Sequence, residues 1–592
     1  MRRISAFFQK RDMSVFPLWE DLKNFRFSFL KYDVFTAILI AFLAIPQAIA
    51  YALLAGVPTK AGFFSAIFGI IFTASFSSSR YLVGGPSTGV SVLIQTAIAT
   101  ALNDFGTISG VDREMLSLHI LNQIVLTVGL LQLIFSLFNL GRILEFVSRP
   151  VILGYFTGVV IAIAVAQVFY FTGVTTASGS GTVIHKIFHF LYKIKEINYV
   201  TLSLGASSLF MLILLRKIKK IPIPLLVLIG ASCVAYILVK MGLVVPTFQN
   251  LGETDSFHIG FSMPSIDLPL ISSLFPSILA IALLTILEVG SVAKGIAAIS
   301  GQKMSNTQEI FAVGFSNVFL SFLPTALPSS GSYTKSIFNF QNGAKTKLSA
   351  LFSGLSLLLI LYFFWPFVKQ VPLTALAAVL FAMLPTIIDK EQVKITLLST
   401  KGDRIAFLLT VLSCLVFRLD IAFFMGIMIS IIFYLEKAAV PHLVEYAFNS
   451  SGRLMILAPK SKVRREVRII GIAGELFFAA VDLFQNSVRT VAEDPYVKVI
   501  VLRLYGVYHV DASMCCALLN LHAYLKATNR ELIISGITEE VWQIFYKAQV
   551  INKIGQDHFF LTDEENPQLS TWKAYVFAED LVNFAKENET LL

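Results

Sequence analysis

Apolar residues dominate the chain from about Asp33 to Val440, and the part that follows mixes apolar and polar positions evenly. Fourteen apolar runs approach the length that crosses a bilayer, although several are short. They centre near Ile45, Ile67, Leu93, Val128, Val160, Ser208, Leu228, Ile281, Phe315, Ile337, Leu358, Ala377, Leu412 and Ile429. The pattern predicts an all-α polytopic membrane domain of 14 spans. Fourteen divides into seven plus seven, and an odd repeat length makes the second half an inverted copy, as in known transporters.

The periodicity changes after Pro441. Strand-like runs alternate with helical ones, which predicts a small cytosolic α/β domain with helices on a sheet. The strand-like runs are 468–473, 498–504 and 532–537, and the helical ones are 477–491, 513–528 and 539–548. We therefore expect a cytosolic N-terminal segment at 1–32, a transmembrane transport domain at 33–440, the α/β domain at 441–570 and a C-terminal tail at 571–592.

Composition agrees with this division and limits the function. With 56% hydrophobic residues, 14% charged residues and a mean hydropathy of +0.75, the chain is predicted to be an integral membrane protein. The net charge of +10 comes largely from basic clusters at the N-terminus and at 216–220. Such clusters are typical of cytoplasmic flanks, so both termini are expected in the cytoplasm of a plasma (bacterial inner) membrane. The basic loop at 186–195 does not fit this orientation.

Two classes of ligand are not indicated. The soluble part lacks the basic and aromatic interleaving of nucleic-acid binders, so no nucleic acid is expected. The four cysteines form neither a disulfide framework nor metal-ligand spacing, so we expect no metal site and no cofactor.

Two polar interruptions break the apolar pattern at corresponding places. Residues 84–89 read Gly-Gly-Pro-Ser-Thr-Gly, and residues 328–334 read Pro-Ser-Ser-Gly-Ser-Tyr-Thr. Lipid cannot satisfy backbone N–H groups, so broken backbone at membrane depth persists where it lines a cavity or binds a ligand. Paired interruptions in the two halves of a membrane chain therefore predict the substrate site of a transporter.

Glu288 is the acidic residue that stands out within a span. It precedes Pro328 of the second interruption by 40 residues, as Pro46 precedes Pro86 of the first. A carboxylate at mid-membrane depth costs roughly 2.5–3.5 kcal/mol on insertion scales, which favours a functional role. A buried carboxyl can hold a proton that travels with an anion. The alternative is a structural ion pair or hydrogen bond.

Lys335 directly follows the second interruption. A cation beside free N–H groups forms an anion site, because its charge and the helix dipole act together. The alternative is a lysine that reaches the cytoplasmic interface. Hydroxyl donors are expected from four nearby residues, although such groups also bond their own helix backbone. They are Ser87, Thr88, Ser332 and Thr334.

Two further features concern the first span and a later loop. Gln47 and Tyr51 are four residues apart and share one helix face, which predicts a cavity wall or a helix–helix contact. Residues 343–346, Gly-Ala-Lys-Thr, resemble the end of a phosphate loop. Ala344 stands where the second glycine is required, so ATP-driven pumping is not supported.

Five motifs, taken in order, resemble one family. They are residues 33–58, 78–86, 331–346, 474–479 and 510–513. The first three resemble the first, third and tenth spans of the SulP anion transporters (sulfate permeases). The last two resemble the STAS domain that follows the membrane part in these proteins. The resemblance covers almost the whole chain.

This resemblance implies an elevator-type transporter in which a core domain moves against a gate domain. The anion site would lie between the third and tenth spans, from Gly85 to Thr88 and from Ser332 to Lys335, with Tyr333 included. Members are usually homodimers, and the acidic residue of the eighth span, here Glu288, is tied to cation coupling. A Glu with the apolar Val292 one turn later favours H+ over sodium as the coupling ion.

The chain departs from the family pattern in the membrane domain. Lys335 stands where the family commonly has Arg, and a lysine loses the bidentate contacts of a guanidinium. Thr307 and Ser305 stand where the family often has Asn and Asp before the ninth span. In the STAS domain, Ser513 matches a position that is phosphorylated in free-standing relatives. A helix N-cap is the alternative role for Ser513, and the domain is expected to bind a cytosolic regulatory protein.

The expected function is secondary active transport of a small inorganic or organic anion, by proton symport. Sulfate, bicarbonate, dicarboxylate and chloride all suit backbone N–H groups and hydroxyls. The alternatives are an uncoupled exchanger or channel, a sodium-coupled bicarbonate symporter, and a membrane-anchored regulatory protein. The chain shows no nucleophile–base pair, so an enzyme is not expected.

Overall fold

The computed structural model describes residues 13–14, 17–23, 25–104, 111–139, 148–174, 182–215, 223–247, 259–368, 370–438, 442–449, 452–457, 465–474, 476–507, 509–563 and 565–590. The basic cluster at 216–220 and most of the expected N-terminal segment lie outside these residues. The chain folds into two compact units, Met1–Ser430 and Ile431–Leu592.

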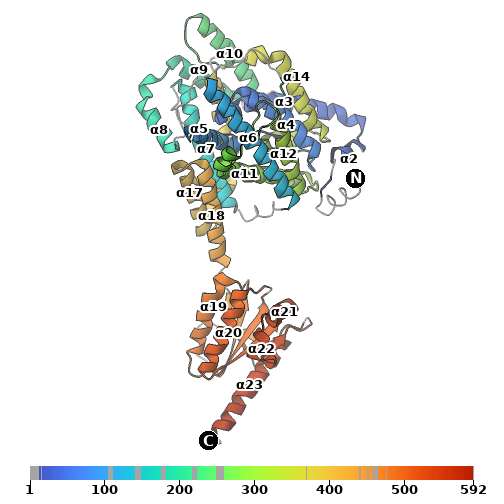
Figure 1. Ribbon diagram of the computed structural model, residues 1–592, viewed down its shortest axis with the longest axis vertical. Coiled ribbons are helices and arrows are strands. Elements are labelled where there is room, and N and C mark those ends of the chain that lie inside the picture. Colours follow the sequence, from blue (N-terminus) through green and yellow to red (C-terminus); the bar gives the residue numbers. More distant parts are fainter. Residues whose placement is uncertain are drawn as a thin grey trace. The chain divides into compact units, whose positions relative to one another are not determined.

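The first unit is built from helices (Figure 1). Its first half contains α2 (Pro17–Lys23), α3 (Phe27–Ala55), α4 (Thr59–Phe76), α5 (Thr88–Asp104), α6 (Val111–Leu137), α7 (Arg149–Thr172), α8 (Val183–Tyr192), a 3-10 turn (Ile194–Glu196), α9 (Tyr199–Leu215) and α10 (Ile223–Lys240). Its second half contains α11 (Leu268–Ser300), α12 (Asn306–Leu320), α13 (Tyr333–Gln341), α14 (Leu348–Val368), α15 (Leu373–Ile387), α16 (Lys390–Leu398), α17 (Lys401–Val416) and α18 (Leu419–Ala438), whose last residues belong to the second unit.

The expected spans correspond to these helices. Each of the fourteen predicted centres lies in a different helix. Among the described residues, eight helices are long and apolar enough to cross a membrane, and a bent pair within 373–398 allows a ninth. Among the remaining spans, α5 and α13 are short because each begins only after one of the two interruptions.

Local chemistry sets the ends of the long helices. The Asp267 side chain accepts a hydrogen bond from the Leu270 amide at 3.1 Å and so caps the start of α11. The helix ends at Gly301, whose φ of +70° is the left-handed conformation that glycine adopts readily. Gly56 ends α3 in the same way, with a φ of +69°.

The helices of the first unit pack in two groups. The first group joins α3–α6 to α11–α14, with α12 packed closely against α6 and α14 against α3. The second group joins α7, α9 and α10 to α15 and α17. Each group therefore takes corresponding helices from both halves of the sequence, as expected for a chain built from two repeats.

A two-stranded sheet joins the two interruptions. Strand β1 (Gly84–Gly85) pairs antiparallel with β2 (Ser330–Gly331), so that Gly84 lies opposite Gly331 and Gly85 opposite Ser330. Helix α5 begins three residues after β1, and α13 begins two residues after β2. Two helix N-termini that are distant in the sequence thus start from one small sheet.

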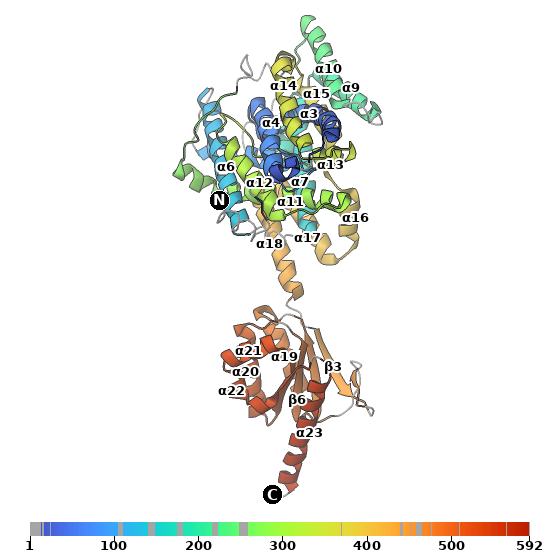
Figure 2. The ribbon, with the colours of Figure 1, turned by 90° about the vertical axis from the view of Figure 1, so that its right-hand side faces the viewer.

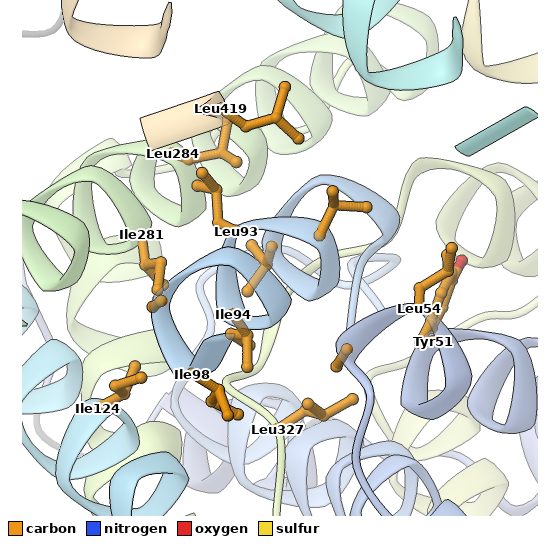
Figure 3. Packing of buried hydrophobic residues seen from close by; sticks show 14 of the residues in the cluster. Tyr51, Leu54, Leu93, Ile94, Ile98, Ile124, Ile281, Leu284, Leu327 and Leu419 are labelled. Atoms are coloured by element: carbon orange, nitrogen blue, oxygen red, sulfur yellow. The ribbon is translucent and has the colours of Figure 1, made fainter. Parts of the chain in front are cut away.

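Apolar side chains hold α5 in place beyond this sheet. Leu93, Ile94 and Ile98 of α5 lie in a buried cluster with Ile281 of α11 and Ile124 of α6 (Figure 3). All five are at most 5% exposed. Helices within a bilayer associate by close van der Waals packing, so these buried contacts keep the short helix in its position.

The second unit contains a six-stranded sheet in the order β4-β3-β5-β6-β7-β8. Strands β5 to β8 are parallel, whereas β3 is antiparallel to both β4 and β5. The strands are β3 (His442–Phe448), β4 (Leu454–Ile456), β5 (Val467–Ala473), β6 (Val499–Gly506), β7 (Glu531–Ile537) and β8 (Phe559–Leu561). The three predicted strands correspond to β5, β6 and β7, whereas β3, β4 and β8 were not predicted.

Helices cover both faces of this sheet (Figure 2). One buried cluster lies between the sheet and α19–α22, and a second lies under α23. These elements are a 3-10 turn (Phe478–Ala480), α19 (Val481–Ala492), α20 (Ala512–Ala527), α21 (Glu539–Lys547), α22 (Val550–Ile554), a 3-10 turn (Gln556–His558) and α23 (Leu569–Thr590). The segment expected as a tail from residue 571 is instead most of α23, because Ala574 and Ala578 are fully buried against the sheet.

Candidate functional site

The site is built around the first turns of α5 and α13. The amides of Thr88 and Gly89 in α5, and of Tyr333 and Thr334 in α13, have no hydrogen-bond partner among the described residues. The N-cap residue of α13, Ser332, makes no side-chain cap bond. First-turn amides that remain free are donors for an anion, and the helix dipoles add to their effect.

Lys335 places a positive charge between these two helix starts. Its side chain is 1% exposed, and its Nζ lies 2.8 Å from the position that a Cβ atom on Gly85 would occupy. No residue that the structure describes bonds or pairs with this ammonium. Gly85 has a φ of +123°, so both its conformation and the nearby lysine require glycine.

Glu288 of α11 lies beside the first turn of α5. Its Oε2 accepts a hydrogen bond of 2.5 Å from the Ser330 hydroxyl in β2. Its Oε1 lies 3.1 Å from the position of a Cβ on Gly89, in the first turn of α5. Within the part of the chain that the structure describes, no ion pair joins Glu288 to Lys335. Of the alternatives that the sequence left open, a hydrogen bond is therefore present, and it ties the carboxyl to the second interruption.

The predicted cavity-wall residues of α3 are both buried. Gln47 is 1% exposed, and neither its Oε1 nor its Nε2 has a partner in the described structure. The hydroxyl of Tyr51 interacts with the Thr88 side chain at the start of α5. An unpartnered buried amide is costly, so Gln47 retains capacity for a ligand.

The remaining residues that were predicted to donate hydroxyl groups differ in how deeply they are buried. Ser87 and Thr88 are half-buried, and Ser87 interacts with Glu288. Ser332, which precedes Lys335 by three residues, is buried. Tyr333 and Thr334 are exposed, so they do not join the buried part of the site.

A polar network that the sequence analysis missed supports β2. Asn317 of α12 accepts a hydrogen bond from the Ser329 amide at 2.6 Å and donates to the Gln132 side chain of α6 at 2.8 Å. The Ser329 hydroxyl accepts from the Gly85 amide at 2.9 Å, and Gln132 donates to Thr285 of α11. These bonds fix both interruptions relative to α6, α11 and α12.

Glu309 is a second buried carboxylate that was missed. It is fully buried and accepts bonds from the Ser77 hydroxyl (2.6 Å), the Ser78 amide (2.9 Å) and hydroxyl (2.6 Å), and the Ser79 amide (2.8 Å). A carboxylate with this many donors has a structural role, because it holds the turn that leads from α4 to β1.

The phosphate-loop-like segment also has a structural role. The amides of Lys345 and Thr346 donate to Asp33 at 2.7 and 3.2 Å, and the Thr346 hydroxyl donates to the same carboxylate at 2.6 Å. Asp33 is fully buried at the start of α3. The loop therefore binds the Asp33 carboxylate of the same chain.

Tyr155 of α7 is a buried residue of the second group of helices. It is 1% exposed, its hydroxyl has no partner in the described structure, and the charges of Glu288 and Asp420 act on it. Its ring meets Phe423 of α18 edge-on at 5.2 Å. A tyrosine in an apolar span gives no sequence signal of such a neighbourhood.

A cavity of about 660 Å³ opens where α3 ends and α6 begins. Four cations, Lys60, Arg113, Lys186 and Arg418, and one carboxylate, Glu114, line it, so positive charge predominates. Arg418 is paired with Asp420 at 2.7 Å. Burial lowers the pKa of Lys186, which lies in α8 outside the spans. Its positive lining makes this cavity a suitable entrance for anions.

In the second unit, Ser513 is not the N-cap of α20. That position belongs to Asp511, whose carboxylate accepts from the Met514 amide at 2.9 Å and from the Phe478 amide at 2.8 Å. Asp511 is better placed because it precedes the first helical residue, whereas Ser513 lies within the first turn. Ser513 is exposed.

The sequence matches two family profiles and many known proteins. Residues 30–413 match the Sulfate permease family, and residues 458–566 match the STAS domain. The chain is 26% identical over 544 residues to the putative sulfate transporter YvdB of Bacillus subtilis, covering 91% of this chain and 97% of that protein. It is also 26% identical over 569 residues to sulfate transporter 4.1, chloroplastic, of Arabidopsis thaliana, covering 93% of this chain and 81% of that protein.

Solved structures show the same fold. The murine Slc26a9 anion transporter in the inward-facing state superimposes with a TM-score of 0.83 at 17% identity, covering 96% of this chain and 94% of that one. This confirms the predicted fold class of a helical membrane domain followed by an α/β STAS domain. Because the first profile covers more than half of the chain, the protein belongs to the sulfate permease family of anion transporters, which are not enzymes.

Proposed function

We propose that the protein is a proton-coupled symporter that takes up a small anion by an elevator mechanism. The buried ammonium of Lys335, which lacks a partner among the described residues, carries this proposal. An unpaired buried charge is strongly unfavourable, so a site that keeps one gains most when a ligand of opposite charge enters. The free amides of the α5 and α13 first turns would complete the coordination of the anion.

Glu288 supplies the coupling in this proposal. The carboxylate lies beside the first turn of α5, where the anion would bind, so a charged Glu288 repels the anion. A proton on Glu288 removes that like charge. Anion binding and proton binding therefore favour each other, and this linkage is reciprocal. Protonation need not break the contact with Ser330, because both groups can donate or accept.

The two packing groups supply the moving parts. The first group contains the whole site, namely α3, α5, α11 and α13, and would act as the core domain. The second group, which contains Tyr155 of α7, would act as the gate. Movement of the core would carry anion and proton together from the basic cavity to the other side.

Uptake of radiolabelled sulfate into proteoliposomes tests the proposal. We expect uptake to rise several-fold with an inward proton gradient, and Glu288→Gln to remove the dependence on the gradient while residual uptake or exchange continues. Glu391→Gln, at an exposed position of α16, is the matched control and should behave as the wild type. If Glu288→Gln keeps the dependence, the coupling role is wrong.

The same assay separates the alternatives. A gradient of sodium that drives uptake in place of protons would assign sodium as the coupling ion. Uptake that ignores both gradients but responds to internal anions would indicate an uncoupled exchanger. Currents far above carrier turnover would indicate a channel.

Sulfate is the first substrate to test, because the relatives above are called sulfate transporters. Bicarbonate, dicarboxylates and chloride remain candidates. Lys335 offers a point charge rather than a planar fork, so it does not select for an oxyanion by bidentate contact. Thermal-shift measurements of the purified protein against these anions would rank them.

We further propose that the protein is a homodimer with both termini in the cytoplasm. Basic residues at the start of α3 and before α14, including Lys31 and Lys345, support this orientation. The STAS domain would then be available to a cytosolic regulatory protein. Cysteine labelling of Ser513→Cys, which is exposed, in spheroplasts and in inverted vesicles tests the orientation.

A further inference from the structure

The start of α3 and the loop before α14 enclose a pocket of about 520 Å³. Ser28, Phe29, Lys31 and Tyr32 line it from α3, and residues 341–343 and Lys345 line it from the loop before α14. The pocket lies far along α3 from Gln47, in the first turns of the helix, and shares no residue with the anion site.

Two lysine ammonium groups lie close to one aromatic ring in this pocket. Nζ of Lys31 lies 5.0 Å from the centre of the Tyr32 ring, and Nζ of Lys345 lies 5.8 Å from the same centre. The two charges can therefore be no further apart than the sum of these distances. Both lysines are exposed, and neither pairs with a carboxylate in the described structure. The nearby Asp33 is occupied by the loop amides.

An apolar stripe leads from the pocket along the outside of α3. Phe27, Lys31, Phe35 and Ile38 share one helix face, since they are spaced by three or four residues or by sums of these, and Val34 adjoins this face. Phe35 is 60% exposed and Ile38 is 40% exposed. In a membrane-spanning helix such residues face acyl chains, while lysines at its end lie at headgroup depth.

We propose that this pocket binds the headgroup of an anionic phospholipid in the leaflet on the side of the N-terminus. Lys31 and Lys345 would hold the phosphate, Tyr32 would lie at the interface, and an acyl chain would follow Phe35 and Ile38. Each lysine near an anionic surface strengthens such binding about fivefold. Two cations close to one ring favour a ligand whose negative group can contact both.

Native mass spectrometry of the full-length protein in detergent tests this proposal. The protein is titrated with phosphatidylglycerol and, separately, with phosphatidylcholine. We expect a first phosphatidylglycerol to bind more tightly than phosphatidylcholine, and Lys31→Gln/Lys345→Gln to weaken it about 10–30-fold. Lys390→Gln/Lys401→Gln is the matched control, since both lysines are exposed at the starts of α16 and α17. Equal binding to wild type and the first double variant would overturn the proposal.

Two further experiments distinguish a lipid phosphate from a soluble one. Inorganic phosphate in excess should not displace phosphatidylglycerol, whereas displacement at equal concentration would assign the pocket to a soluble anion and overturn the lipid assignment. Phe35→Asn keeps both lysines and should weaken the lipid alone. Thermal unfolding of each variant distinguishes a lost site from a lost fold.

Discussion

The ammonium of Lys335 lies 2.8 Å from the place where Gly85 would carry a side chain. Gly85→Ala should therefore push Lys335 out of position, and the φ of +123° adds backbone strain. We expect anion uptake to fall at least tenfold in proteoliposomes. Gly230→Ala is the control, because no atom lies within 4 Å of its added methyl group. Normal uptake by Gly85→Ala would contradict this geometry.

Lys335→Met separates stability from function. Methionine has a similar length and removes a buried charge that lacks a partner among the described residues, so the unfolding temperature should stay equal or rise. A charge-assisted contact contributes about 1.5–3 kcal/mol, so affinity for the anion should fall by a factor of about 10–150. Anion-dependent thermal shifts measure both quantities. A variant that unfolds early but still binds the anion would assign Lys335 a structural role.

Glu309→Gln should lower the stability of the fold, whereas Glu288→Gln should leave stability unchanged and remove proton coupling. Glu309 accepts four hydrogen bonds, and the amide, which carries no charge and has only one acceptor oxygen, cannot replace them. We expect Glu309→Gln to lose about 3 kcal/mol or more of stability. Glu288→Gln should keep its unfolding temperature. Size-exclusion profiles and thermal melts of the two variants provide the comparison.

Asn317→Ala should disconnect β2 from its support. The substitution leaves the Ser329 amide without its acceptor and Gln132 without its donor. Each buried group left unsatisfied costs about 1–3 kcal/mol, so the protein should melt earlier and lose uptake. Gln392→Ala, on the exposed surface of α16, serves as the reference. Retained uptake would show that the network does not position the site.

Asp511 and Ser513 make a matched pair in the STAS domain. Asp511→Ala removes the N-cap of α20 and the acceptor of the Phe478 amide, at a cost of about 1–2 kcal/mol. Ser513→Ala should change stability by less than about 0.5 kcal/mol. Urea unfolding of a fragment from His442 to Thr590 measures both, and the reverse order would restore Ser513 as the cap.

Acid should destabilise the same fragment through His522. Burial lowers the pKa of this imidazole below its ordinary value. The unfolded chain therefore binds more protons than the folded one, so stability decreases as the pH falls through about 6.5. His522→Gln should weaken this dependence in thermal melts at several pH values, whereas His509→Gln, at an exposed position, should not.

The sequence indicated the membrane helices and the two interruptions because both depend on local patterns. Apolar length reveals a span, and Gly, Pro and Ser reveal where one breaks. Lys335 and Glu288 were identifiable because a charge within an apolar run is conspicuous. The strands β3, β4 and β8 escaped because two are only three residues long and β3 follows directly on the last span.

The supporting residues could not be predicted because their partners are distant in the chain. Asn317 and Gln132 are polar residues within apolar helices, which indicates that each has a partner but not which one. They are 185 residues apart, and Asp33 lies more than 300 residues from the loop amides whose hydrogen bonds it accepts. The burial of Tyr155 is harder still to predict from the sequence, because a tyrosine in an apolar span has the same pattern whether or not its hydroxyl has a partner.

The small sheet of β1 and β2 has a mechanical consequence. Gly84 and Gly85 pair with Gly331 and Ser330, and the Val83 amide donates to the Ser336 hydroxyl at 2.8 Å. Separating the two helix starts would break several buried hydrogen bonds at once. Under the proposed elevator mechanism, the starts of α5 and α13 would therefore move together as one rigid body rather than tilt separately.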